Sequence, residues 1–180
     1  QEVAYETLMP DRREAIHAAA GRALEQFYEG RLQEIYDRLA HHYARTGEAA
    51  KAVEYLTSFA DKSARAYAHD EAVKALTEAL SHAERVPAEI RDRRRIELVV
   101  RLPRSLTPLG RLSEIFSLLL GERERVERLR DPALAAHYHY TLGRAYMLGR
   151  RDLALQHARR ALAEAERCGD PATVGRAYGL

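Results

Sequence analysis

The chain has 180 residues, a length that suits one domain or two small ones. Apolar residues make up 46% of the sequence and charged residues 31%, which is enough to build a core beneath a charged surface. The 29 basic and 27 acidic residues leave a net charge of only +2. This balance lacks the basic excess of most nucleic-acid-binding proteins, so we expect no nucleic-acid partner.

The sequence also argues against a membrane or secreted protein. No apolar run approaches the ~20 residues that a membrane helix needs. The opening residues, QEVAYETL, lack the charged start and apolar block of a signal peptide. Cys168 is the single cysteine, which excludes an intramolecular disulfide and a zinc site built from cysteines. We therefore expect a cytoplasmic protein without a membrane partner.

Helical periodicity runs through the whole chain, and no stretch shows the period-two alternation of a strand. Pro, Gly and Asp residues divide it into segments, with Pro103, Pro108 and Gly110 marking a kinked loop. Asp70 and Asp131 are expected to cap the helices that they precede, and Gly121 to bend its helix. The predicted helices are 1–9, 10–28, 32–45, 49–68, 70–85, 88–102, 111–129, 132–148, 151–168 and one beginning at 171.

The segment 49–68 allows two interpretations. It is either one long helix, or a helix that breaks and is followed by a short first helix of the next repeat at 60–68. The distance of 20 residues between Ala52 and Ala72 is shorter than the ~34 of a tetratricopeptide repeat. We favour a break near Ala60.

The clearest local pattern lies between Leu39 and Leu56, in LAHHYARTGEAAKAVEYL. Small residues at Ala40 and Ala52 allow two helices to approach closely, and Gly47 supplies the turn between them. This spacing of aromatic, small and glycine residues resembles the tetratricopeptide repeat. A related pattern recurs from Leu142 to Leu162.

An internal repeat supports this interpretation. The motif Asp-Pro-Ala occurs at Asp131 and again at Asp170, a period of 39 residues. Such a period is typical of stacked helical hairpins. We therefore predict an all-α fold, a right-handed superhelix of stacked antiparallel hairpins. Residues 1–30 would be a helical linker or the end of a preceding domain, and 31–180 a repeat domain that is open at both ends.

No motif for catalysis, a cofactor or a metal is found. The chain has no phosphate-binding glycine loop and no nucleophile elbow. Neither His41 with His42 nor His137 with His139 has the i, i+4 spacing of helical zinc ligands. The arginines at 91 and 93–95 are interpreted as a solvated helix face, with phosphate binding as the lesser alternative. We expect no enzyme activity.

The opening residues resemble a more specific family. Gln1 to Tyr5, a break at Leu8 to Pro10, the pair Arg12-Arg13 and His17 in an Ala-rich helix match a segment of bacterial STAND-type signal-transduction ATPases. These ATPases include MalT-like and LuxR-type transcription regulators and ATPases fused to adenylate/guanylate cyclases. There the segment joins the ATPase core to helical repeats. The resemblance implies that this chain is the sensor or docking arm of such a regulator, without its ATPase or cyclase chemistry.

The first helices of stacked hairpins line a concave groove. We expect this groove to bind a protein or peptide segment, from a partner or from the same protein, through a few aromatic and charged anchors. A small-ligand-sensing superhelix that controls an attached ATPase or cyclase is the alternative. The candidate groove residues are Glu34, Asp37, His41 and Arg45 (the first groove set) and His137, Tyr140, Arg144 and Met147 (the second groove set).

Overall fold

The computed structural model describes residues 9–147 and 149–180, and all regular structure in these residues is helical. The all-α prediction is thus confirmed, whereas the predicted helix at 1–9 lies outside the described residues except for Met9. The elements in chain order are α2 (Pro10–Phe27), η1 (Leu32–Glu34), α3 (Tyr36–Tyr43), α4 (Ala49–Arg65), α5 (His69–Ala83), α6 (Ala88–Val99), α7 (Pro103–Leu106), α8 (Leu112–Gly121), α9 (Arg123–Leu129), α10 (Pro132–Tyr146), α11 (Arg151–Cys168) and α12 (Pro171–Tyr178).

The chain divides into two compact units, which meet between Pro87 and Ala88. Unit 1 holds α2 to α5, and unit 2 holds α6 to α12. The predicted boundary between residues 30 and 31 concerns a different division and stays a prediction.

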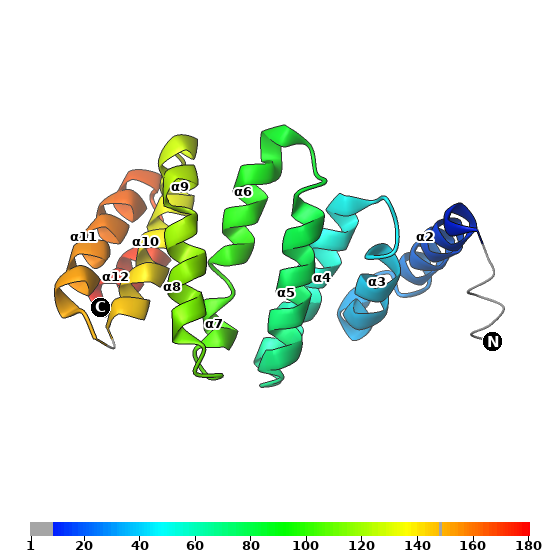
Figure 1. The fold of residues 1–180 in the computed structure, drawn as a ribbon, viewed down its shortest axis with the longest axis horizontal. Helices are drawn as coiled ribbons and strands as arrows, with labels where there is room; N and C mark the ends of the chain where they lie inside the picture. Colours follow the sequence, from blue (N-terminus) through cyan, green and yellow to red (C-terminus); the bar gives the residue numbers. More distant parts are fainter. Residues whose placement is uncertain (1–8, 148) are drawn as a thin grey trace. The chain divides into compact units, whose positions relative to one another are not determined.

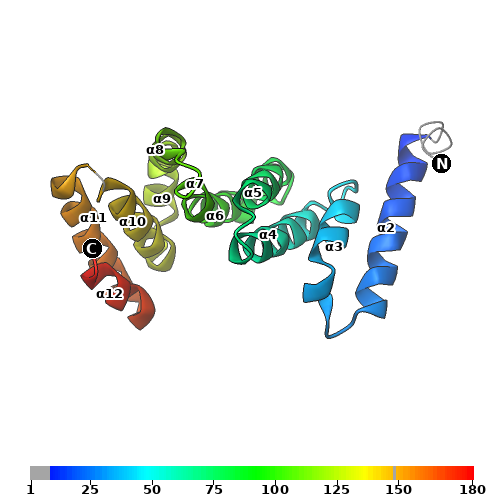
Figure 2. The ribbon, with the colours of Figure 1, turned by 90° about the horizontal axis from the view of Figure 1, so that it is seen from below.

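The hairpin of α3 and α4 forms the centre of unit 1, and the two helices lie side by side in Figure 2. Its predicted inward positions are confirmed, because Leu39 and Tyr43 on α3 and Ala52 on α4 are fully enclosed. Ala40 and Leu56 are also buried. Small side chains on both helices allow the backbones to approach, and the larger ones fill the space beside them.

The predicted break near Ala60 is wrong. Helix α4 continues to Arg65 with Ala60 and Ala64 buried, and α5 packs beside it (Figure 1). No Gly or Pro between residues 48 and 86 interrupts the helical hydrogen bonds. The chain reverses at Tyr67, which adopts a left-handed conformation with φ of 62°. Helix α5 then begins at His69 without a side-chain cap, so the cap predicted at Asp70 is also wrong.

The predicted helix 32–45 is shorter and divided. A 3₁₀ turn, η1, comes first, and Ile35 then leaves the helical region with φ of −124° and ψ of 22°. Ile35 itself is buried in the core of unit 1. Consequently Glu34 does not belong to α3. Of the first groove set, Asp37 and His41 are on α3, and Arg45 follows its end.

Helix α2 packs through a face that sequence periodicity did not select. His17 and Gly21 are buried on it, whereas Ile16 and Phe27 of the apolar stripe remain 47% and 75% exposed. A Cβ atom at Gly21 would lie only 2.9 Å from Cζ of Tyr43, so the glycine permits the tyrosine ring to lie directly against the helix. A glycine therefore sets the distance between α2 and α3.

In unit 2, α10 and α11 form the main hairpin, and α12 packs against both (Figures 1 and 2). Leu142, Ala154 and Ala161 are buried at this interface, as the recurring pattern predicts. A Cβ atom at Gly143 would lie 3.4 Å from the backbone oxygen of Ala154, so the helices approach closely at that point. Asp131 accepts a hydrogen bond from a backbone N–H group of α10, which confirms the predicted cap, and Asp170 caps α12 in the same way.

The first half of unit 2 departs from two predictions. The expected loop at 103–110 contains the short helix α7, which begins at Pro103 as proline favours. The predicted helix 111–129 divides into α8 and α9 at Glu122, next to the expected bend at Gly121. Glu122 is buried, and its role is described below.

Candidate binding surfaces

The first groove set lies on exposed parts of unit 1. Glu34 is in η1, Asp37 and His41 are on α3, and Arg45 follows the end of α3. All four side chains are exposed. The Arg45 guanidinium donates to the backbone oxygen of His41 at 2.7 Å, which fixes the arginine beside the histidine.

His41 belongs to a cluster of three imidazoles that joins α2 to α3. The Nδ1 atoms of His17 and His42 are 3.0 Å apart, and the His41 ring centre lies 5.8 Å from that of His17. Burial lowers the pKa of all three histidines, and the charge of Arg45 lowers it further. The cluster is therefore neutral near pH 7 and joins the helices through neutral imidazoles.

A polar network beneath this face holds α2, α3 and α4 together. The carboxylate of Glu25 accepts hydrogen bonds from the Tyr43 hydroxyl at 2.7 Å, from Lys51 Nζ at 2.7 and 2.9 Å, and from the Tyr55 hydroxyl. Burial acts to raise the pKa of Glu25, but the hydrogen bonds from Lys51, Tyr55 and Tyr43 outweigh it and lower the pKa. The network is thus a satisfied structural support rather than a reactive carboxylate.

Sequence reasoning missed this network because the partners of Glu25 lie 18 to 30 residues from it in the chain. Glu25 is one of several charged residues on an Ala-rich helix, and nothing in its local pattern distinguishes it. The usable signal was Tyr55, because the hydroxyl of a buried tyrosine needs a hydrogen-bond partner.

The second groove set shares one face of α10 in unit 2. His137 and Tyr140 are half-buried, whereas Arg144 and Met147 are exposed. Arg176 of α12 lies over the Tyr140 ring, 5.4 Å from its centre. Burial, followed by the charges of Arg176 and Arg101, lowers the pKa of His137. Helix α12 therefore covers part of this set.

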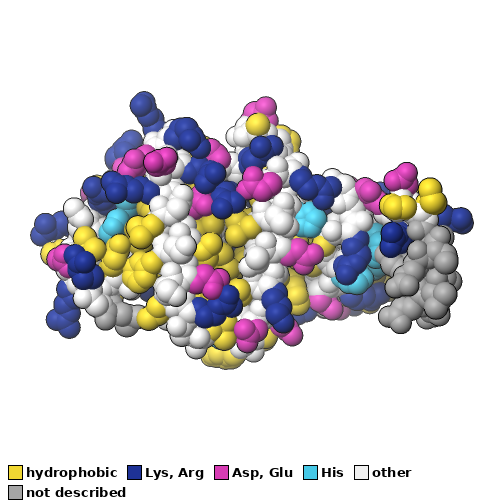
Figure 3. All heavy atoms as spheres, in the orientation of Figure 1, with side chains coloured by type: hydrophobic (Ala, Val, Ile, Leu, Met, Phe, Trp, Pro, Cys, Tyr) yellow, Lys and Arg dark blue, Asp and Glu magenta, His cyan; other side chains and the backbone are white. Residues whose placement is uncertain are grey.

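The opposite face of α10 carries a feature that the sequence did not indicate. The His139 and His157 rings are stacked with Nδ1 atoms 3.0 Å apart, and the Tyr146 ring stacks on His157. A pocket of about 340 Å³ adjoins these rings and is also lined by Leu120, Arg123, Leu153 and Arg160. In Figure 3 a histidine patch lies beside arginine and apolar side chains on this part of unit 2. Neighbouring Tyr138 is a packing residue, since its buried hydroxyl donates to the Leu119 oxygen.

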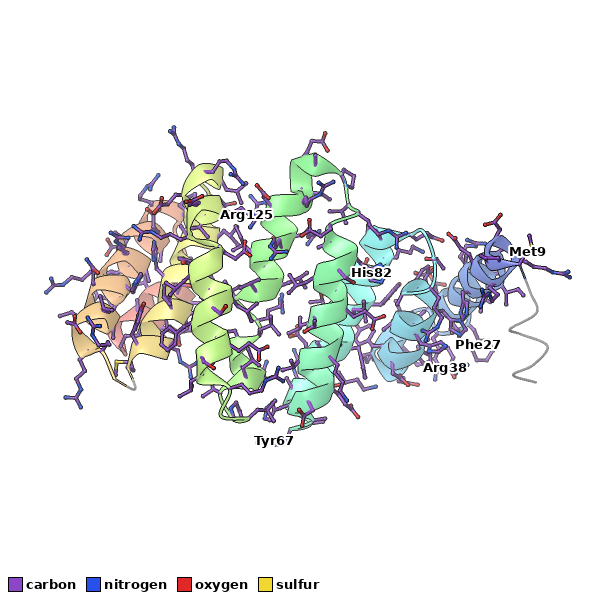
Figure 4. The ribbon with its side chains drawn as sticks, in the orientation of Figure 1. Met9, Phe27, Arg38, Tyr67, His82 and Arg125 are labelled. Carbon is purple, nitrogen blue, oxygen red and sulfur yellow. The ribbon has the colours of Figure 1, made fainter. Side chains whose placement is uncertain are left out.

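Arginines of the run on α6 form ion pairs with carboxylates of the same unit. Arg95 pairs with Glu122 at 2.7 Å, and Arg93 pairs with Asp131. Arg125 of α9, labelled in Figure 4, bridges Glu122 and Asp92. The mixed charges of residues 122–130 suggest an exposed helix side, but Glu122 is only 3% exposed. These ion pairs neutralise much of the charge that phosphate binding would need.

Two further features concern ligands and membranes. In residues 9–147 and 149–180, no group of three or more His, Cys, Asp or Glu side chains is placed to hold a metal ion. None of the helices in these residues combines the length and the hydropathy of a membrane span.

Comparison of the chain with protein-family models, with curated proteins and with solved structures finds no match.

Proposed function

We propose that the chain is a tetratricopeptide-like docking module that binds protein or peptide segments through its groove sets, one in each unit. The carrying observation is that Asp37 and His41 are exposed on α3, while the opposite side of this helix is held in place by buried contacts. Tyr43 of that helix is fully buried, and its hydroxyl is held by Glu25 and Lys51. A rigid backing beneath exposed charged and imidazole groups lowers the cost of ordering a bound peptide.

The architecture that we propose is a right-handed superhelix of stacked hairpins. It is supported by the packing of α3 with α4 and of α10 with α11, each joined by a short turn. Anchors of the kind that dominate binding are present in both sets, namely the exposed Arg45 and Arg144 and the partly accessible Tyr140.

We propose further that the module belongs to a bacterial STAND-type regulator. The exposed stripe on α2 supports this assignment. Met9, Ile16 and Phe27 are exposed on one side of the helix, and Figure 4 shows Met9 and Phe27 at its two ends. A large exposed apolar stripe is typical of a surface that another element covers. A P-loop ATPase encoded upstream of Gln1 would support the assignment, whereas a complete reading frame without any ATPase would contradict it.

The docking proposal is tested with peptides selected from a random library on the 180-residue chain. A triple variant, His41→Ala with Tyr140→Ala and Arg144→Ala, is compared with a control triple, Lys74→Ala with Arg159→Ala and Glu166→Ala. The control residues are also exposed. We expect the first variant to lose about tenfold or more in affinity and the control less than about twofold. Equal affinities for all three proteins would refute the groove assignment.

Small-ligand sensing is the second candidate, and the pocket beside His139 favours it. A volume of about 340 Å³ lies within the usual range for small-molecule sites. A ligand-dependent rise in the melting temperature would support this function. No shift across a broad metabolite panel would count against it.

A further inference from the structure

The pocket of unit 2 has one apolar side and one basic side. Leu120 of α8, Leu142 of α10 and Leu153 of α11 supply apolar lining. Arg123 of α9 and Arg160 of α11 supply the charges, and no carboxylate lines this pocket. An occupant that matches both sides has an apolar body and an anionic end.

The two arginines differ in how freely they can meet a ligand. Arg160 forms no ion pair with any described residue. Arg123 pairs with Glu127 at 3.1 Å, but both side chains are more than half exposed. Such exposed pairs are weak and screened by solvent, so an anion can compete for Arg123. The pocket therefore presents two guanidinium groups, the preferred partners of carboxylates.

The stacked histidines add directional donors. Because the Nδ1 atoms of His139 and His157 are 3.0 Å apart, one Nδ1 donates a hydrogen and the other accepts it. In a neutral pair, the accepting ring carries its hydrogen on Nε2, and the donating ring has a bare Nε2. One added proton converts the bare Nε2 into a second donor and leaves the bond between the rings intact. The pair can thus respond to an anion by binding one proton.

Burial, with the surrounding positive charges, keeps this pair neutral when the pocket is empty. Burial lowers the pKa of His139 to about 4, and the charges of His157 and Arg160 contribute. Burial also lowers the pKa of His157, together with Arg160 and Arg123. The other charged groups around His139 line the adjoining pocket, and these are Glu127, Arg130, Asp131, Glu164 and Arg167.

We infer that this pocket binds a small organic carboxylate with an apolar body, and that binding is coupled to uptake of one proton by the pair His139–His157. The site lies on the face of α10 opposite the second groove set, so it does not depend on the docking proposal. The inference rests on the second candidate function, small-ligand sensing, and specifies the chemical class of the ligand.

The test uses 2-naphthoate as the probe, with calorimetric titration of the 180-residue chain. We expect saturable binding with Kd below about 1 mM, which corresponds to about −4 kcal/mol. Affinity should rise at least about threefold between pH 7.5 and 6.0, because the bound anion favours the protonated pair. The neutral isostere 2-naphthalenemethanol and inorganic sulfate should each bind at least about tenfold more weakly, since each satisfies only one side of the pocket.

Arg160→Ala and Arg159→Ala form a matched pair of variants, because the two arginines are exposed neighbours on α11 and only Arg160 lines the pocket. We expect Arg160→Ala to weaken 2-naphthoate binding about tenfold and Arg159→Ala to leave it within about twofold. Equal effects of the two variants, no saturable binding, or an affinity independent of pH would overturn the inference. Tight binding of the neutral isostere would refute the carboxylate class while leaving ligand sensing in place.

Discussion

At the scale of single residues, the contact of Gly21 with Tyr43 makes an unusual prediction. Alanine normally stabilises a helix interior by about 0.5–1 kcal/mol relative to glycine. At Gly21 the new Cβ would meet the Tyr43 ring at 2.9 Å, and that ring is fixed by burial and hydrogen bonds. We expect Gly21→Ala to lower the free energy of unfolding by about 1–3 kcal/mol.

Gly175→Ala is the matched control, because a Cβ at this position in α12 would meet nothing within 4 Å. It should stabilise the protein by up to about 1 kcal/mol. Chemical denaturation followed by circular dichroism measures both variants. Stabilisation by both would show that Tyr43 moves aside and that the close contact is not structurally required.

The Glu25 network gives a second residue-scale prediction. Glu25→Ala removes the acceptor of two tyrosine hydroxyls and of Lys51, and it leaves buried donors without partners. We expect a loss of about 2–4 kcal/mol in the free energy of unfolding. Glu29→Ala, an exposed change on the segment after α2, should cost less than about 0.5 kcal/mol. A similar small loss for Glu25→Ala would contradict a stabilising role of the network.

At the scale of elements, two neighbouring arginines of α6 allow the contribution of a buried ion pair to be compared with that of an exposed one. Arg95 pairs with the buried Glu122, whereas Arg94 pairs with Glu97 on its own helix, where it is exposed. Arg95→Ala should cost about 2–4 kcal/mol because Glu122 loses a partner inside the protein. Arg94→Ala should cost less than about 0.5 kcal/mol. Equal unfolding midpoints for the two variants would contradict this account.

Periodicity predicted the existence of most elements, and it located the α3–α4 and α10–α11 hairpins through small residues at their interfaces. It failed where contacts between residues far apart in the sequence determine which side chains are buried. On α2 the apolar residues Ile16 and Phe27 recur at helical spacing, but the packed face carries His17 and Gly21. At the start of α9 the mixed charges suggest an exposed segment, whereas Glu122 is buried between Arg95, 27 residues away, and Arg125 of α9.

The candidate sites show the same limit. The exposure of Asp37 and His41 could be predicted, because exposed polar positions on a short amphipathic helix follow from its buried ones, whereas their role in binding stays a prediction. The pocket beside His139 could not, since it brings together residues of α8, α9, α10 and α11. The pair of His139 and His157 spans 18 residues and has no local motif.

At the scale of the whole molecule, the histidines predict sensitivity to acid. In the described residues, seven histidines have a pKa lowered below its ordinary value of 6.5, chiefly by burial: His17, His41, His42, His82, His137, His139 and His157. The unfolded chain therefore binds protons before the folded chain does. Stability is fully present above about pH 6.5 and falls as the pH decreases toward the folded-state pKa values.

We expect the free energy of unfolding to fall by about 2–5 kcal/mol between pH 7.5 and 5.0, given a limit of about 1.4 kcal/mol per pH unit for each titrating histidine. Denaturation midpoints at several pH values measure this change. His82→Gln should reduce the dependence, since its buried Nδ1 has no hydrogen-bond partner. A midpoint that is constant over this range would contradict the burial of neutral imidazoles.

The central claim is that each groove set forms a docking surface within its own unit, the first at the α3–α4 hairpin and the second at the α10–α11 hairpin. The most direct measurement is a crystal structure of the chain with a library-selected peptide. We predict that the peptide contacts His41 and Arg45, or Tyr140 and Arg144. A peptide seated on α11 or on the apolar stripe of α2, with both groove sets uncovered, would contradict the claim.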